Sequence, residues 1–278
     1  MRMKSGFTLI EMSIVLVIIG LIVGGILVGV DLVNAAAIRS QISQIERYNT
    51  AVRTFQGKYG YLPGDIPDPY ATNAGFAARG TAHPGQGDGN GLIEAWNNAN
   101  TTGFYSPSDE LGAFWVDLST AGLIDGTFNF ATPTFVETGL ITVHPASKYF
   151  PAGKIGNGNY VYVWSNAGFN YFGLSIPTGS AGAAYLLSSP GLSVQQAYNV
   201  DKKVDDGFPQ TGSVTATYLN NGVQWAAGGG ANGKSNTSAT LPTSTTCYDN
   251  GGVTGTQNYS TTQNNGTGIN CALSFKFQ

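Results

Sequence analysis

Residues 7–30 of the chain read FTLIEMSIVLVIIGLIVGGILVGV. This run of 24 residues holds one charged side chain, Glu11, among apolar and small residues. As an α-helix rising about 1.5 Å per residue it would measure about 36 Å, whereas the hydrocarbon core of a bilayer is about 30 Å thick. The run therefore predicts a helix that is long enough to span a membrane.

The residues around this run indicate what kind of segment it is. The head Met1–Gly6 carries two basic residues, Arg2 and Lys4, and the positive-inside rule then places the N-terminus in the cytoplasm. A secretory signal peptide would have a small-residue cleavage site after its apolar run, but Val28–Asp31 offers no such pattern. The small residue stands before the run instead, as Gly6 at the end of the head.

The combination of Lys4-Ser5-Gly6 with Phe7-Thr8-Leu9-Ile10-Glu11 and a long apolar helix resembles the prepilin class, which comprises type IV pilins and the pseudopilins of type II secretion. This resemblance implies that a prepilin peptidase and N-methyltransferase cuts between Gly6 and Phe7 and methylates the new terminal amine of Phe7. It also implies that the apolar helix stays on the mature protein, first as a membrane anchor and then as the core of a filament.

Glu11 requires a partner, because an ionised carboxylate inside hydrocarbon is energetically unfavourable. The resemblance implies that this partner is the N-terminal amine of a neighbouring subunit, so that Glu11 serves assembly. The alternative is a carboxylate near the start of the helix that reaches the lipid headgroups. Gly20, Gly24, Gly25 and Gly29 weaken the same helix. They indicate either local unwinding on entry into a filament or close helix packing, and the sequence leaves both open.

A second pattern follows the apolar run. Between Ile38 and Tyr59, apolar residues recur at steps of three and four, which predicts an amphipathic helix that packs on a domain. Gly57, Gly60 and the turn sequence at 62–65 predict its end. The chain thus divides into a leader (1–6), a transmembrane or filament-core helix (7–30), the amphipathic half of the same helix (31–59) and a globular β-rich domain (60–278).

The globular part predicts an α+β fold in which the long N-terminal helix packs on a mostly antiparallel sheet. The resemblance to prepilins implies the same, type IV pilin-like architecture. Ser108–Gly122 has the pattern of a capped helix, and a short helix is expected around Val194–Asn199. Strands are expected at Leu140–Val143, Tyr160–Trp164, Tyr171–Ile176, Val214–Leu219 and Ala272–Phe277.

The only two cysteines are Cys247 and Cys271. In an oxidising compartment they would close a loop, which stabilises the fold by roughly 3–4 kcal/mol in the chain-entropy model. Two unpaired buried thiols are the alternative. The resemblance favours the disulfide, because pilins typically have a disulfide-bounded C-terminal region.

Two acidic segments are candidates for structural calcium, which binds oxygen ligands. The first contains Asp88, Asn90 and Glu94 among glycines, and it matches part of a calcium loop. The second contains Asp201, Asp205 and Asp206. A solvated turn rich in Asp and Gly explains each of them without a metal.

Other functions find little support. The formal net charge is −3, and it becomes −5 once Arg2 and Lys4 are removed, which disfavours nucleic-acid binding. Residues 228–235 match the letters of a phosphate-binding loop, but the residues after them are a poor start for the helix that such a loop requires. His83 and His144 stand far apart in the sequence and lie in no catalytic motif, so no enzyme is predicted.

The sequence therefore predicts a structural subunit of a type IV pilus or of a type II secretion pseudopilus. Its expected partners are the prepilin peptidase, other pilin or pseudopilin subunits and an inner-membrane assembly platform. It is expected in the bacterial inner membrane first, and in a periplasmic or extracellular filament after assembly. The alternative is a membrane-anchored binding or adhesion protein that does not polymerise.

Overall fold

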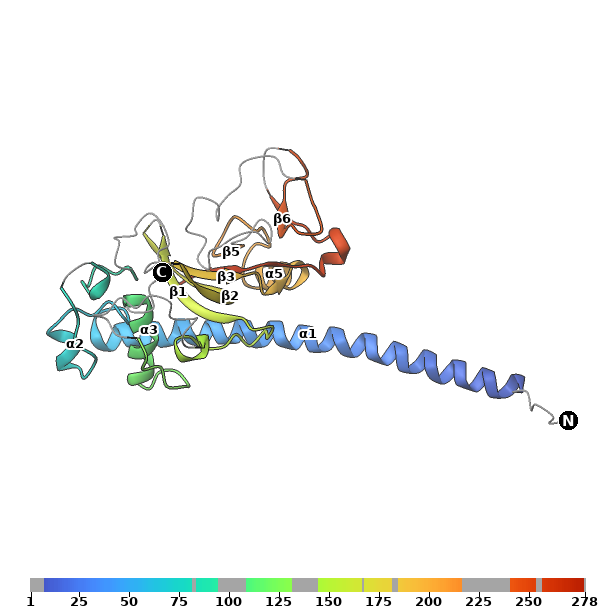
Figure 1. Ribbon diagram of the computed structural model, residues 1–278, viewed down its shortest axis with the longest axis horizontal. Coiled ribbons are helices and arrows are strands. Elements are labelled where there is room, and N and C mark those ends of the chain that lie inside the picture. Colours follow the sequence, from blue (N-terminus) through green and yellow to red (C-terminus); the bar gives the residue numbers. More distant parts are fainter. Residues whose placement is uncertain are drawn as a thin grey trace.

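The computed structural model describes residues 8–81, 84–94, 109–131, 145–166, 168–181, 185–216, 241–253 and 257–277. It consists of one very long helix, α1, with a globular region packed on its C-terminal half (Figure 1). The N-terminal half of α1 extends away from the globular region as a free rod.

Helix α1 spans Leu9–Tyr59 without interruption. It begins after Thr8, which caps its N-terminus, and it ends at Gly60, whose φ of 82° places it in the left-handed region that favours glycine. Its buried residues recur at helical spacing along one face, as the sequence predicts. They are Ile38, Gln41, Gln44, Ile45, Tyr48, Ala51, Val52 and Phe55.

The main sheet has five strands, all paired antiparallel, in the order β1-β2-β9-β5, with β3 also paired to β2. The strands are β1 (Tyr160–Asn166), β2 (Phe169–Ala181), β3 (Tyr185–Ser189), β5 (Val214–Ala216) and β9 (Leu273–Lys276). The predicted antiparallel sheet against a long helix is therefore confirmed. The strand expected at 140–143 lies outside the described residues.

Shorter elements surround this sheet. Two further two-stranded pairs join β4 to β8 and β6 to β7. These strands are β4 (Leu192–Ser193), β6 (Tyr248–Asp249), β7 (Asn258–Tyr259) and β8 (Ile269–Cys271), and the helices are α2 (Tyr70–Asn73), η1 (Pro84–Gln86), α3 (Glu110–Thr120), η2 (Ala146–Lys148), α5 (Val194–Val204) and η3 (Gln263–Gly266). Helix α5 extends five residues beyond the predicted end at Asn199.

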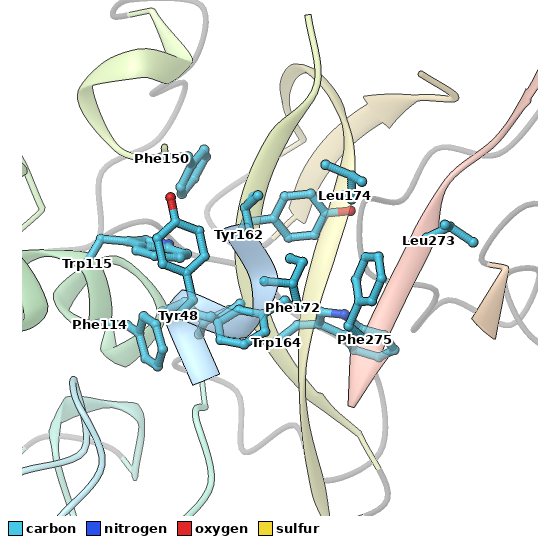
Figure 2. Close-up of a cluster of buried hydrophobic side chains, with 14 of the residues drawn as sticks. Tyr48, Phe114, Trp115, Phe150, Tyr162, Trp164, Phe172, Leu174, Leu273 and Phe275 are labelled. Carbon is cyan, nitrogen blue, oxygen red and sulfur yellow. The ribbon is translucent and has the colours of Figure 1, made fainter. Parts of the chain in front are cut away.

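Aromatic side chains join α1, α3 and the sheet into one core (Figure 2). Tyr48 of α1 meets Trp115 of α3 edge to face, with ring centroids 5.0 Å apart, and also contacts Phe172 of β2. Phe172 in turn stacks on Phe277 at 4.3 Å. Such pairs add to the hydrophobic stabilisation that comes from burial itself. The globular region is thereby fixed to one face of the helix that carries the N-terminus.

Candidate functional site

The N-terminal half of α1 is an exposed apolar surface. Its large apolar side chains from Leu9 to Val33 are all exposed, with Leu9 at 89% and Val33 at 69%. Among the described residues α1 is the helix with the length and composition to cross a membrane, and its most apolar window has a mean hydropathy of 2.9 with none of it buried. A soluble domain would not leave such a surface in water, so the rod needs lipid or other helices around it.

Glu11 forms a capping box with Thr8 at the start of this rod. The backbone N–H and the hydroxyl of Thr8 each donate to Oε2 of Glu11 at 2.8 Å, and the backbone N–H of Glu11 donates to the Thr8 hydroxyl oxygen at 3.3 Å. The carboxylate thereby satisfies an N–H that the first turn of a helix leaves open. Among the described residues Oε1 of Glu11 accepts no hydrogen bond, so the carboxylate keeps one oxygen for another partner.

The sequence prediction for Glu11 considered a neighbouring amine and lipid headgroups, and it missed Thr8. The signal was present as Thr8-x-x-Glu11, the pattern of a capping box before an apolar run. Gly6 and Phe7, the predicted processing residues, lie outside the described residues. In the isolated chain α1 is helical through Gly20, Gly24 and Gly25.

The C-terminal region is closed by the predicted disulfide. Cys247 and Cys271 are bonded, with their Cα atoms 5.0 Å apart, and both side chains are buried. Between them, Tyr259 donates a hydrogen bond of 2.7 Å from its hydroxyl to Oδ2 of Asp201 in α5. Inside the closed segment, the hydroxyl of Ser260 donates to Oδ2 of Asp249 at 2.6 Å. The disulfide-closed segment is therefore attached to α5 by a buried side-chain contact.

The first acidic segment forms a hydrogen-bonded turn. The Asn90 amide donates to Oδ2 of Asp88 at 3.0 Å and to Oε2 of Glu94 at 2.9 Å, so these three side chains do meet. The carboxylates that gather around Asp88 are, however, those of Asp65 and Glu110, with oxygen atoms within 4.8 Å of one another. Glu94 is not part of that group.

Asp65 and Glu110 hold the loop that carries Asp88. Asp65 accepts from the N–H groups of Gly89 and Gly91, and Glu110 accepts from those of Gly87 and Glu94, at 2.7–2.9 Å. Burial raises the pKa of Asp65 to about 7, and burial together with the neighbouring Asp65 raises the pKa of Glu110 well above its usual value. Sequence reasoning treated Asp65 as a turn residue and Glu110 as part of a helix first turn, so it missed their shared role.

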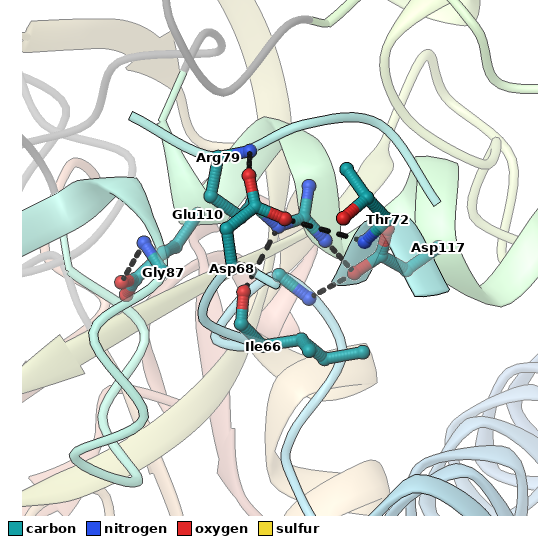
Figure 3. Close-up of polar contacts among 8 residues, drawn as sticks. Ile66, Asp68, Thr72, Arg79, Gly87, Glu110 and Asp117 are labelled. Carbon is teal, nitrogen blue, oxygen red and sulfur yellow. Dashed lines mark hydrogen bonds and ion pairs between the residues drawn. The ribbon is translucent and has the colours of Figure 1, made fainter. Parts of the chain in front are cut away.

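A buried ion pair fixes the segment before this loop (Figure 3). Arg79 meets Oδ2 of Asp117 in α3 at 2.5 Å, and both side chains are almost fully buried. The same Asp117 oxygen accepts from Gly64 N–H at 2.7 Å, while Arg79 Nε donates to the Ile66 carbonyl at 3.1 Å. Asp68 accepts from the backbone N–H of Arg79 at 2.6 Å. These contacts tie the chain that leaves α1 to α3.

The three carboxylates of the second acidic segment lie close together. Asp201, Asp205 and Asp206 have carboxylate oxygens within 4.8 Å of one another. Asp201 accepts from Gly207 N–H at 3.0 Å as well as from Tyr259, and burial raises its pKa to about 6. Asp205 accepts from the backbone N–H groups of Ser213 and Val214. Asp206 accepts from the Phe208 N–H at 2.8 Å and from the Thr211 hydroxyl at 2.5 Å. Each carboxylate thus accepts hydrogen bonds from the protein itself.

The remaining sequence candidates lie outside the described residues. These are His83, His144 and the segment 228–235.

One family model matches the chain. It is the prokaryotic N-terminal methylation motif, and it covers residues 1–27. No curated protein and no solved structure matches the chain. The match ends within the apolar half of α1 and does not reach the globular region. The chain carries the prepilin-type cleavage and methylation signature of type IV pilins and pseudopilins.

Proposed function

We propose that this protein is a structural subunit of a type IV pilus or of a type II secretion pseudopilus. In this proposal a prepilin peptidase cleaves after Gly6 and methylates Phe7, and the mature chain of 272 residues polymerises through α1. The subunit waits in the inner membrane with its N-terminus in the cytoplasm, as the basic residues Arg2 and Lys4 favour. An assembly platform then moves it into a filament whose surface is the globular region.

The observation that carries this proposal is the position of Glu11. It is the one charged residue between Leu9 and Val30, in the exposed apolar part of α1, and it stands within the matched methylation motif. An anchor that only holds a domain on a membrane has no use for a carboxylate at this depth. A filament does, because the amine of the next subunit can bind the Oε1 atom that Thr8 leaves open, and each mismatched register would leave the charge unpaired.

The test compares Glu11→Ala with Ser13→Ala in cells that assemble the filament. Ser13 lies on the same rod, and its hydroxyl donates to the carbonyl of Ile10 in its own helix at 2.9 Å. We expect both variants to be cleaved after Gly6, which the intact mass of each chain reports. Ser13→Ala should appear in the sheared filament fraction at the wild-type level, and Glu11→Ala should be absent from it.

Filaments formed by Glu11→Ala at the wild-type yield would overturn the proposal. A wild-type chain that is cleaved after Gly6 but stays in the membrane and never enters the sheared filament fraction would favour the alternative, a membrane-anchored binding or adhesion protein that does not polymerise.

A further inference from the structure

A polar groove lies where α1 leaves its apolar half. It has a volume of about 620 Å³ and runs between α1 and α5, with the end of η3 and the residues after it as its third wall. Figure 1 shows α5 and the red C-terminal segment at the end of the globular region from which the free half of α1 emerges. The residues that line the groove are Asp31, Asn34, Ala35, Ile38, Asn157, Ser193, Gln195, Gln196, Asn199, Lys203, Asn265, Gly266, Thr267 and Ile269.

The lining is rich in side-chain amides and carries one charge of each sign, Asp31 on α1 and Lys203 on α5. Both charged side chains are exposed, and among the described residues neither takes part in a hydrogen bond or an ion pair. Gln196 uses Oε1 to accept from the Ser193 N–H at 3.0 Å, which leaves its amide N–H groups for a ligand. The groove therefore offers a ligand three groups: the Asp31 carboxylate, the Lys203 ammonium and the amide N–H groups of Gln196.

The length of α1 sets the position of the groove relative to the membrane. Leu9–Val30 comprises 22 residues, or about 33 Å of helix, which matches a hydrocarbon core of about 30 Å. Asp31 then stands at the edge of the hydrocarbon, and Asn34 and Ile38 lie roughly 4.5 and 10.5 Å further along the axis. The headgroup layer of one leaflet is roughly 5–8 Å thick. In a membrane-inserted subunit the end of the groove at Asp31 and Asn34 lies within that layer, and the end at Ile38 lies just beyond it.

We propose that this groove binds the headgroup of an ethanolamine phospholipid. The phosphate meets Lys203 and the amide N–H groups of α5, while the ammonium donates to Asp31 and to amide oxygens on α1. A glycerol headgroup carries the negative charge of its phosphate and no cation, so it offers no opposite charge to Asp31. A choline headgroup has no N–H with which to bind Asp31. The proposal rests on the membrane stage of the proposed function, and it adds a lipid that sets the depth of the subunit before assembly.

A second copy of the chain is a weaker candidate for this groove. The surface that a neighbouring α1 would offer between Met12 and Val30 is apolar, whereas the groove is lined mainly by amides and hydroxyls. Burying those groups against an apolar helix would leave them without hydrogen bonds.

The experiment uses the full chain in vesicles of equal parts phosphatidylcholine, phosphatidylethanolamine and phosphatidylglycerol. After mild detergent extraction, native mass spectrometry identifies the lipids that remain bound. We expect one phosphatidylethanolamine per chain as the dominant adduct. Lys203→Ala should lower its occupancy about tenfold, since losing one charge-assisted hydrogen bond changes affinity by roughly that factor or more. Asp31→Asn should shift the preference towards phosphatidylglycerol.

Lys202→Ala is the matched control. Lys202 precedes Lys203 on α5 and lies against Tyr198, with 3.2 Å between Nζ and the hydroxyl oxygen, outside the groove lining. This variant should keep the wild-type adduct. Lipid adducts in proportion to the vesicle composition, or equal loss in Lys202→Ala and Lys203→Ala, would overturn the proposal. So would a cross-link from Asn199→Cys to a second chain in place of lipid. The proposed filament function would survive each of these results, because cleavage and assembly are measured separately.

Discussion

The hydroxyl of Tyr259 lies 2.7 Å from Oδ2 of Asp201, and this contact joins the disulfide-closed segment to α5. The carboxylate is buried, and its other oxygen accepts from Gly207 N–H. The C-terminal region is therefore attached to the domain by one disulfide and by a hydrogen bond whose loss leaves a buried acceptor with fewer donors.

Tyr259→Phe removes this hydrogen bond and little else. We expect the free energy of unfolding to fall by about 1–3 kcal/mol, because a buried carboxylate oxygen loses its donor. Urea unfolding of the full chain in detergent, followed by tryptophan fluorescence, measures the change. The control is Tyr198→Phe, which removes a neighbouring hydroxyl whose partner, Lys202, is exposed, and which should change the stability little. Equal stabilities for the wild type and Tyr259→Phe would show that the contact is not needed.

Asp65 makes the stability depend on pH. Burial raises its folded pKa to about 7, against the N–H groups of Gly91 and Gly89, whose hydrogen bonds lower it. The unfolded pKa is about 3.9. The folded chain thus binds more protons than the unfolded chain between these values. The contribution of Asp65 to the free energy of unfolding is fully present below about pH 4, decreases as the pH rises, and is lost above about pH 7.

Urea midpoints measured from pH 4 to pH 8 in EDTA should therefore decrease, and Asp65→Asn should give a flatter profile. The neighbouring Asp88 carboxylate adds to the raised pKa of Asp65, and Asp65 adds to the raised pKa of Glu110. Asp88→Asn and Glu110→Gln should therefore flatten the profile as well. A midpoint that increases over this range would contradict this interpretation of the buried carboxylates.

Arg79→Ala tests the buried ion pair. The substitution leaves the Asp117 carboxylate buried without its cation, and breaking such a pair lowers stability by about 3–5 kcal/mol. Arg53→Ala, on the exposed face of α1, is the control and should stay within about 0.5 kcal/mol of the wild type. An Arg79→Ala chain as stable as the Arg53→Ala chain would mean that the ion pair contributes nothing to the fold.

The parts of the fold that were predictable from sequence have a periodic or terminal signal. The apolar run, the stripe from Ile38 to Tyr59 and the left-handed Gly60 together set the extent of α1. The helix begins at Leu9, two residues after the predicted Phe7, because Thr8 occupies the N-cap. The pattern Thr8-x-x-Glu11 contains that information.

The remaining parts depend on contacts between distant residues. Strands such as β6 and β7 have two residues each, too few to show alternation. Asp65 and Glu110 are 45 positions apart, and each resembles an ordinary turn or helix-start residue until the fold buries both against one loop. Arg79 stands in a loop-rich segment, where its burial depends on Asp117, 38 positions later. No local pattern distinguishes such residues from exposed ones.

Processing of the N-terminus is the step on which the whole account depends. The most direct test is the intact mass, with N-terminal fragmentation, of the protein purified from its native membrane. We predict that the purified chain begins at N-methylated Phe7. A chain that still carries Met1–Gly6, in cells with an active prepilin peptidase, would contradict it.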